Sequence, residues 1–279
     1  MRLIDEFFRA RIDPRPLALC RITVGAAAFL RALVSYHLMD RLLRPEAIQA
    51  HAIAWIPQLT RPWLLPYIAL WLVAAAMFTI GYRTRLAGTV LCLQIAYHLT
   101  ADQNLFWNHI YFLGLVLLLL TVADSDTAFS VRWLRAGRPA WTAAHWSVVL
   151  LKLQVSLVYV FSAVMKMNAE FLSGRVIEEA FEFLPGVLRL PEVFVATSWL
   201  TVVLELFIGI GLWIPGARLV AIAGGILLHS LVPVLIGLYG GLVVFSTSIL
   251  GTYWLFLNQR EFAALEQWFG NRMKGSCAA

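Results

Sequence analysis

Long apolar stretches separated by short polar ones fill most of this chain. Eight of them approach membrane-spanning length, at 16–38, 64–82, 86–101, 107–123, 146–167, 197–214, 218–237 and 240–257. A helix of about 20 apolar residues crosses the hydrocarbon core of a bilayer, and a helix satisfies its own backbone hydrogen bonds there. The pattern therefore predicts an all-α, polytopic transmembrane helical bundle of about eight spans.

The composition favours a membrane protein over a soluble domain. Of the 279 residues, 61% are hydrophobic and 14% are charged, whereas a soluble domain carries roughly 25% charged residues. The net charge of +6 comes mostly from arginines in the predicted loops, so we expect no nucleic-acid partner. The three cysteines are far apart in sequence, and we expect neither a disulfide framework nor a metal site.

The loops carry their positive charge unevenly, which predicts an orientation. With a cytoplasmic N-terminus, thirteen lysines and arginines outside the spans fall on the inner side and five on the outer side, namely Arg41, Arg44, Arg61, Arg175 and Arg189. Positive residues concentrate in cytoplasmic loops. We therefore expect both termini to be cytoplasmic, an even number of crossings, and a multi-pass protein of the cell (inner) membrane.

The segments outside the bundle also carry expectations. The charged, amphipathic residues 1–15 predict an interfacial N-terminal helix rather than a signal peptide. Residues 258–279 are expected to form a short cytoplasmic tail. The longest outer loop, 168–196, is acidic, and we expect a separate protein partner to bind there if there is one.

The span 146–167 carries a polar stripe. Lys152, Ser156, Tyr159, Ser162 and Lys166 follow one another at steps of four or three residues, which places them on one helical face. A stripe of this kind faces protein or water rather than lipid. Two interpretations remain open, a seam of interhelical hydrogen bonds and the lining of a site.

Other titratable groups gather towards the outer side of the predicted spans. His98 and His109 lie at outer span ends, and His229 lies past the middle of its span. Glu205 lies in mid-span and requires a cationic partner if it is ionised. The candidates are Arg21, Arg31, Lys152 and Lys166. A structural ion pair and a functional carboxylate are both consistent with this position.

Three segments resemble known proteins. They are NHIYFLGLVLLLLTVADSDTAFSV, LKLQVSLVYVFSAVMKMNAEFLSGRVI and LLHSLVPVLIGLYGGLVVFSTSIL, at 108–131, 151–177 and 227–250. Together they resemble the membrane region of the vitamin K-dependent γ-carboxylase family and the bacterial HTTM (horizontally transferred transmembrane) domain. The resemblance covers about residues 10–260, so an HTTM-like bundle is expected over 16–257.

The resemblance implies a chemistry and a site. Lys166 matches the family's catalytic base, with Met165 in place of the first lysine of the family's pair, and Asn108 and His109 match the residues that stabilise developing charge. The substrate-binding residues are then expected to be Tyr159, Ser162, His229, Glu205 and His98. The substrate would be a lipid-soluble small molecule, a reduced, vitamin K-like quinone, with O2 and CO2 and without a metal, in a lyase-type carboxylation or another oxidation-coupled proton abstraction.

Two other functions remain as alternatives. A non-catalytic membrane assembly factor, or a toxin- or peptide-maturation factor, is one alternative, in which the acidic outer loop binds a partner and the polar stripe is an interhelical seam. With only a short tail expected after the last span, we do not expect carboxylation of a protein substrate without a separate subunit. A small-solute or proton transporter is the other. Its lining would be Lys152, Tyr159, Glu205 and His229, although the chain shows no clear pair of broken helices.

Overall fold

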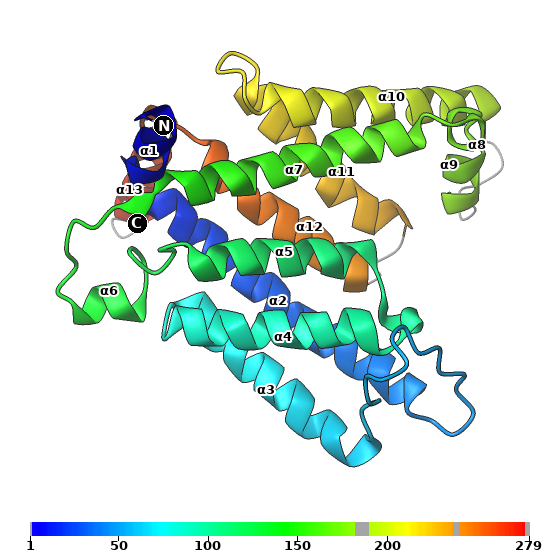
Figure 1. Cartoon of the computed structure of the whole chain (residues 1–279). Helices are drawn as coiled ribbons and strands as arrows, with labels where there is room; N and C mark the ends of the chain where they lie inside the picture. The colour runs from blue at the N-terminus through cyan, green and yellow to red at the C-terminus, as the bar shows by residue number, and fades with distance from the viewer. Residues whose placement is uncertain (1, 182–189, 237–239, 277–279) are drawn as a thin grey trace.

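The computed structural model describes residues 2–181, 190–236 and 240–276. Its main helices run back and forth between two ends of a bundle (Figure 1). They are α2 (Arg15–Leu42), α3 (Arg61–Ile80), α4 (Thr84–Ala101), α5 (Asn108–Val122), α7 (His145–Lys166), α10 (Pro191–Gly211), α11 (Arg218–Ile236) and α12 (Gly240–Thr252), which continues as the 3-10 turn η3 (Tyr253–Phe256).

Both ends of the chain lie at the same end of this bundle, which we call the termini end (Figure 1). The turns at 81–83 and 212–217 also lie there. The opposite end, which we call the distal end, carries the connections at 43–60, 102–107 and 167–181 (Figure 1).

Each predicted apolar stretch falls on one of these helices, so the all-helical prediction is confirmed. By length and composition, four of the described helices can cross a membrane, namely α2, α3, α7 and α10. A fifth span is possible if α12 with η3 is joined to the following helix across a bend of 113°. Helices α5 and α11 are apolar but shorter. Helix α10 begins at Pro191, six residues before the predicted span, because proline suits the first helical turn.

The N-terminal segment is only partly helical. Helix α1 (Arg2–Arg9) is followed by a two-residue strand, β1 (Arg11–Ile12), which pairs antiparallel with β2 (Ala143–Ala144). The predicted helix over 1–15 therefore ends early. Asp13 accepts hydrogen bonds from the backbone and side chain of Arg15. Burial raises the pKa of Asp13, but these bonds and the charge of Arg15 outweigh it and leave the pKa below its usual value.

The C-terminal segment forms a helix, α13 (Gln259–Ser276). The Asn258 side chain accepts a hydrogen bond from the Glu261 amide at 2.9 Å, and the Glu261 carboxylate accepts one from the Asn258 amide at 2.8 Å. This reciprocal pair is a capping box, and it explains why a helix begins at the start of the predicted tail segment.

The predicted acidic loop contains two short helices, α8 (Ala169–Leu172) and α9 (Arg175–Ala180). Asn168 starts α8 by accepting a hydrogen bond from the Phe171 amide at 2.9 Å. Residues 182–189 of this loop lie outside the described residues.

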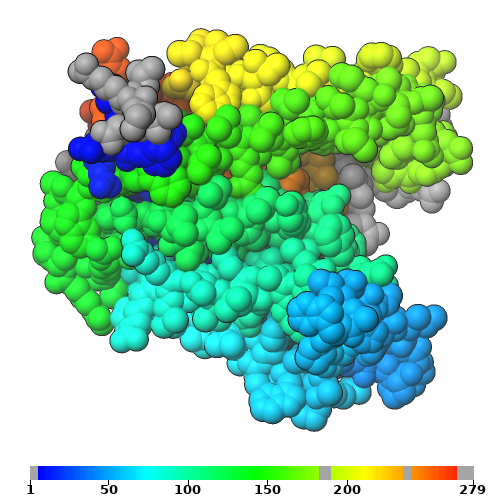
Figure 2. Space-filling model, in the orientation of Figure 1, coloured from blue at the N-terminus to red at the C-terminus, as the bar shows by residue number. Residues whose placement is uncertain are grey.

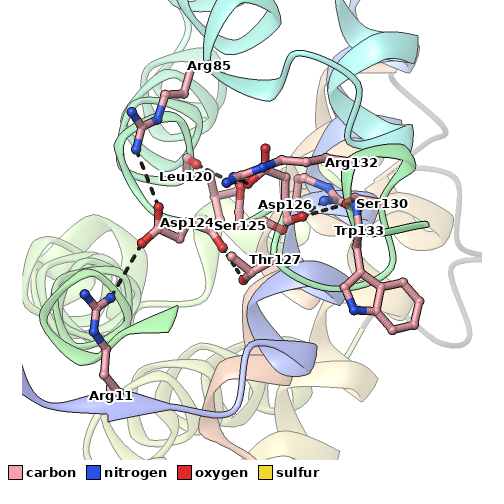
Figure 3. A network of polar contacts seen from close by, with 11 residues as sticks. Arg11, Arg85, Leu120, Asp124, Ser125, Asp126, Thr127, Ser130, Arg132 and Trp133 are labelled. Atoms are coloured by element: carbon pink, nitrogen blue, oxygen red, sulfur yellow. Dashed lines mark hydrogen bonds and ion pairs between the residues drawn. The ribbon is translucent and has the colours of Figure 1, made fainter. Parts of the chain in front are cut away.

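Polar contacts at the termini end tie the loops to the bundle. Asp124 lies between Arg85 and Arg11, at 3.5 and 3.7 Å, and Asp126 pairs with Arg132 at 2.8 Å (Figure 3). The buried Arg21 of α2 reaches the same region and donates hydrogen bonds to the carbonyl oxygens of Ser125 and Phe129. The Arg21 guanidinium, which lies inside a predicted span, therefore finds its hydrogen-bond acceptors in the loop that follows α5.

Small residues let the helices approach closely. A Cβ atom at Gly25 of α2 would lie 3.0 Å from the Cα atom of Thr79 on α3 and closer still to the Thr79 hydroxyl. Close backbone approach at glycine is typical of membrane helix packing. The core between these helices includes the buried Trp71, Phe78 and Val24.

We expect Gly25→Ala to destabilise the protein by about 1–3 kcal/mol, because α2 and α3 must move apart to admit the new methyl group. Thermal unfolding in detergent measures the effect. Gly216→Ala is the matched control, since nothing lies within 4 Å of a Cβ atom there. Equal melting temperatures for the two variants would contradict this description of the α2–α3 contact.

Candidate functional site

Lys166 and Glu205 form an ion pair at the distal end of the bundle. The Lys166 ammonium nitrogen lies 2.9 Å from both carboxylate oxygens of Glu205 and also donates to the Ser162 hydroxyl. Ser162 in turn donates to Glu205 at 3.1 Å. The side chains of Lys166 and Glu205 are 29% and 10% exposed. The mid-span carboxylate therefore has a cationic partner, one of the four candidates in the sequence.

The local sequence explains how these groups meet. Ser162 and Lys166 lie one helical turn apart on the face of α7 that packs against α10. Gly209 of α10 lets the helices approach, because a Cβ atom there would lie 3.2 Å from the Ser156 carbonyl oxygen. Helix α7 ends at Lys166, and the Phe171 ring of α8 lies 5.9 Å from the ammonium group.

A second group of polar side chains lies one turn further into α7. The Tyr159 hydroxyl contacts Nε2 of His229 on α11 at 2.7 Å and forms a short hydrogen bond with the Tyr253 hydroxyl. All three side chains are buried. Gly225 leaves room for the Tyr253 hydroxyl, which a Cβ atom there would overlap.

Aromatic contacts extend this group towards α5. The His229 ring lies 5.4 Å from Phe245 of α12, and Phe245 lies 4.7 Å from His109, measured between ring centroids. His229 is also close enough to both Lys166 and His109 to interact electrostatically with them. Lys166, His229 and His109 therefore belong to one region of the distal half, built from α5, α7, α11 and α12.

Several buried polar atoms in this region have no hydrogen-bond partner among the described residues. They are Nδ1 of His109, Nδ1 of His229 and the hydroxyl of Ser246. Buried polar groups are normally paired, and exceptions call for an explanation such as a bound molecule. These atoms can therefore still form hydrogen bonds.

The protein surface is hollowed near this region. Figure 2 shows a recess between α7 and α5 at the distal end, with atoms of α11 and α12 visible behind it. Lys166 is the last residue of α7 and Asn108 is the first of α5. The recess opens on the side of the bundle.

Two predicted site residues lie apart from the ion pair. Asn108 is exposed at the start of α5. His98 of α4 is buried, and its Nε2 atom lies 2.9 Å from a guanidinium nitrogen of Arg31 on α2. The tertiary contacts therefore join Ser162, Glu205 and Lys166 directly and join Tyr159 to His229, whereas His98 belongs to a different polar pair.

The polar stripe on α7 divides into two parts. At its inner part, the Ser156 hydroxyl accepts a hydrogen bond from the Trp213 indole at 2.7 Å, and the Lys152 ammonium lies 5.3 Å from the Phe256 ring. These contacts connect α7 to neighbouring elements, which agrees with the interpretation of the stripe as an interhelical seam. Tyr253 and Phe245 were not predicted from the sequence, because neither interrupts the apolar pattern of its segment.

Comparison with known proteins identifies the family of the chain. No solved structure matches it. The family model of the HTTM domain matches residues 9–259, which include every helix from α2 to α12 and therefore all the site residues. The recognition made from the three sequence segments is thus confirmed, and the chain belongs to the HTTM-domain family of membrane proteins.

Proposed function

We propose that this protein is a membrane enzyme in which Lys166, assisted by Glu205, takes a proton from a lipid-soluble, hydroquinone-like substrate. The observation that carries the proposal is the cluster of Lys166, Ser162 and Glu205 at the distal end. Ionisable side chains inside membrane segments mark functional sites more often than they mark packing. The resemblance to the γ-carboxylase family, in which Lys166 matches the base, supports the same assignment.

The proton transfer can be described from the geometry of the pair. A carboxylate oxygen 2.9 Å from the ammonium nitrogen is within reach for sharing or accepting its proton. The amine that results has a free lone pair. Transfer of a substrate hydroxyl proton to it breaks one O–H bond and forms one N–H bond, and the electron pair stays on the substrate oxygen.

The negative charge that develops on the substrate needs stabilisation. Donors held in place by the protein provide it most effectively in a water-poor site. His229 and His109 each have an Nδ1 atom without a partner in the described part of the chain, and either imidazole can donate from that atom. We assign them, with Asn108 at the mouth of the site, to this role. When O2 and CO2 are bound as co-substrates, they would supply the carboxylation or other oxidation-coupled chemistry.

The proposal includes a membrane orientation. The chain would lie in the cell (inner) membrane with the termini end in the cytoplasm and eight crossings, the shorter helices being tilted or covered by neighbours. The charge distribution supports this orientation, since Arg83, Arg85, Arg132 and Arg135 lie in or beside turns of the termini end. The Lys166 site would then open to the outer leaflet, and a protein partner would reach it along the acidic segment 168–196.

A non-catalytic assembly factor is the second candidate function. The pairing of Lys166 with Glu205 favours it, because each charged group already has a partner inside the protein. Such a pair can serve packing alone, and buried ion pairs can often be replaced by apolar side chains without loss of stability. The two functions therefore differ in what an apolar replacement of the pair would do.

We expect Lys166→Ala to lower turnover of reduced vitamin K1 in proteoliposomes by at least ~100-fold, which is the contribution of a positioned general base. Oxygen consumption and the oxidised quinone product are the measurements. Lys152→Met is the matched control, because it removes a lysine from the inner part of the same stripe. Full activity in Lys166→Ala, or no turnover by the unmodified protein, would contradict the proposed reaction.

The double variant Lys166→Met/Glu205→Met separates the enzyme from the assembly factor. Lys166→Met alone leaves a buried carboxylate unpaired, and we expect a loss of ~3 kcal/mol in stability. The double variant should recover most of that loss while remaining inactive. Turnover by the double variant would contradict catalysis by Lys166, whereas restored stability together with no turnover even by the unmodified protein would favour the assembly factor.

Cysteine labelling tests the orientation. In a background without the native cysteines, we expect Glu46→Cys at the distal end to react with a membrane-impermeant maleimide in intact cells. Ala136→Cys at the termini end should react only after permeabilisation. Both positions are exposed, so the difference reports sidedness, and the reverse pattern would mean that the termini lie outside.

A further inference from the structure

Arg31 is a buried cation without an anionic partner in the described part of the chain. It lies on α2 and is 3% exposed. Its position, sixteen residues after the start of α2, is about 24 Å along the helix. One guanidinium nitrogen, Nη2, contacts Nε2 of His98 at 2.9 Å, and the Nε atom has no hydrogen-bond partner. A neutral imidazole does not cancel the charge.

Arg21, on the same helix, shows how the protein satisfies a buried arginine elsewhere. Two carbonyl oxygens accept hydrogen bonds from Arg21, and the carboxylate of Asp126 lies within electrostatic range. For Arg31, the phenol of Tyr67 is the only negatively ionisable neighbour within such range among residues 2–181, 190–236 and 240–276. The two arginines are equally deep in the protein, so burial alone does not explain the difference.

The surroundings of Arg31 contain more hydrogen-bond donors than acceptors. A guanidinium can only donate, so Nε2 of His98 must accept, and the proton of that imidazole is on Nδ1. Nδ1 of His98 has no partner, and neither do the Ser35 hydroxyl and the Trp71 indole nitrogen, among the residues described. Each of these side chains is 0% exposed.

These donors come from neighbouring elements. Ser35 lies one turn after Arg31 on the same face of α2, and the Trp71 ring of α3 lies perpendicular to His98 at 5.8 Å. An unpartnered acceptor, the Gln94 side-chain oxygen, lies one turn before His98 on α4. This oxygen can accept a hydrogen bond from one of these donors, but it cannot neutralise the positive charge of Arg31.

From these observations we propose that Arg31, His98 and Ser35 form a buried binding site for a carboxylate-shaped monoanion, between α2, α3 and α4. An unpaired charge in the membrane interior is costly, and a bound anion removes that cost. One negative charge neutralises one guanidinium. The planar arrangement of the guanidinium N–H donors matches the two oxygens of a carboxylate. The carboxylate is either a free small anion or the head group of an acyl chain.

The site is distinct from the Lys166 ion pair but electrically connected to the same region. Arg31 is close enough to His109 to interact electrostatically with it, and His109 packs against Phe245 next to His229. A bound anion would therefore offset the positive charge that Arg31 presents to His109. The proposal goes beyond proton abstraction by Lys166 and does not depend on it.

Thermal unfolding of the full-length protein in nanodiscs tests the site. Formate is titrated against gluconate, a bulkier carboxylate, at constant ionic strength, and a parallel arm uses nanodiscs with and without oleate. We expect the melting temperature to rise with the logarithm of the formate concentration, by roughly 5 °C or more at about 100-fold above the dissociation constant. Arg31→Met should abolish the rise, whereas Lys152→Met and Lys166→Ala should keep it.

The outcomes separate the two sources of the anion. A rise with formate supports a free anion, and a rise with oleate alone supports a carboxylate on an acyl chain. If Arg31→Met does not fold, Arg31→Lys and an NMR titration of 13C-formate replace it, with affinity expected to fall about 10-fold because the fork is lost. The proposal is overturned if neither probe raises the melting temperature of the unmodified protein more than gluconate does, or if Arg31→Met shows an equal rise.

Discussion

The ion pair of Lys166 and Glu205 connects α7 to α10 at the end where the proposed chemistry takes place. A carboxylate in the middle of an apolar helix cannot reach water, so its partner must come from another helix. The contact therefore has two consequences. It fixes the register of α10 along α7 through Ser162 and both carboxylate oxygens, and it holds a proton-sharing pair in a defined place.

The same constraint is met in different ways along the bundle. At the termini end, acidic and basic side chains pair with one another, and carbonyl oxygens satisfy Arg21 (Figure 3). At the distal end, by contrast, the Nδ1 atoms of His109 and His229 have no hydrogen-bond partner among the described residues. An end with paired charges suits a membrane anchor, and an end with spare donors suits ligand binding.

The stripe on α7 illustrates how one sequence pattern can serve two purposes. Its inner part, with Ser156 bonded to Trp213, holds helices together. Its outer part, with Tyr159, Ser162 and Lys166, contacts groups from three other elements and lies near the recess between α7 and α5 (Figure 2). A helical face is continuous, but its neighbours change along the bundle. The inner part is an interhelical seam, and the outer part is the lining of a site only under the proposed function.

The sequence by itself determined the helical fold, the places of the apolar segments and the family, because apolar length and periodicity are local properties of the chain. It also required a partner for Glu205. Only the tertiary structure decided that the partner is Lys166, that Tyr253 and Phe245 line the site, and that His98 faces Arg31. Those contacts join residues far apart in sequence, and their pairing depends on how helices pack and rotate against one another, which no local pattern encodes.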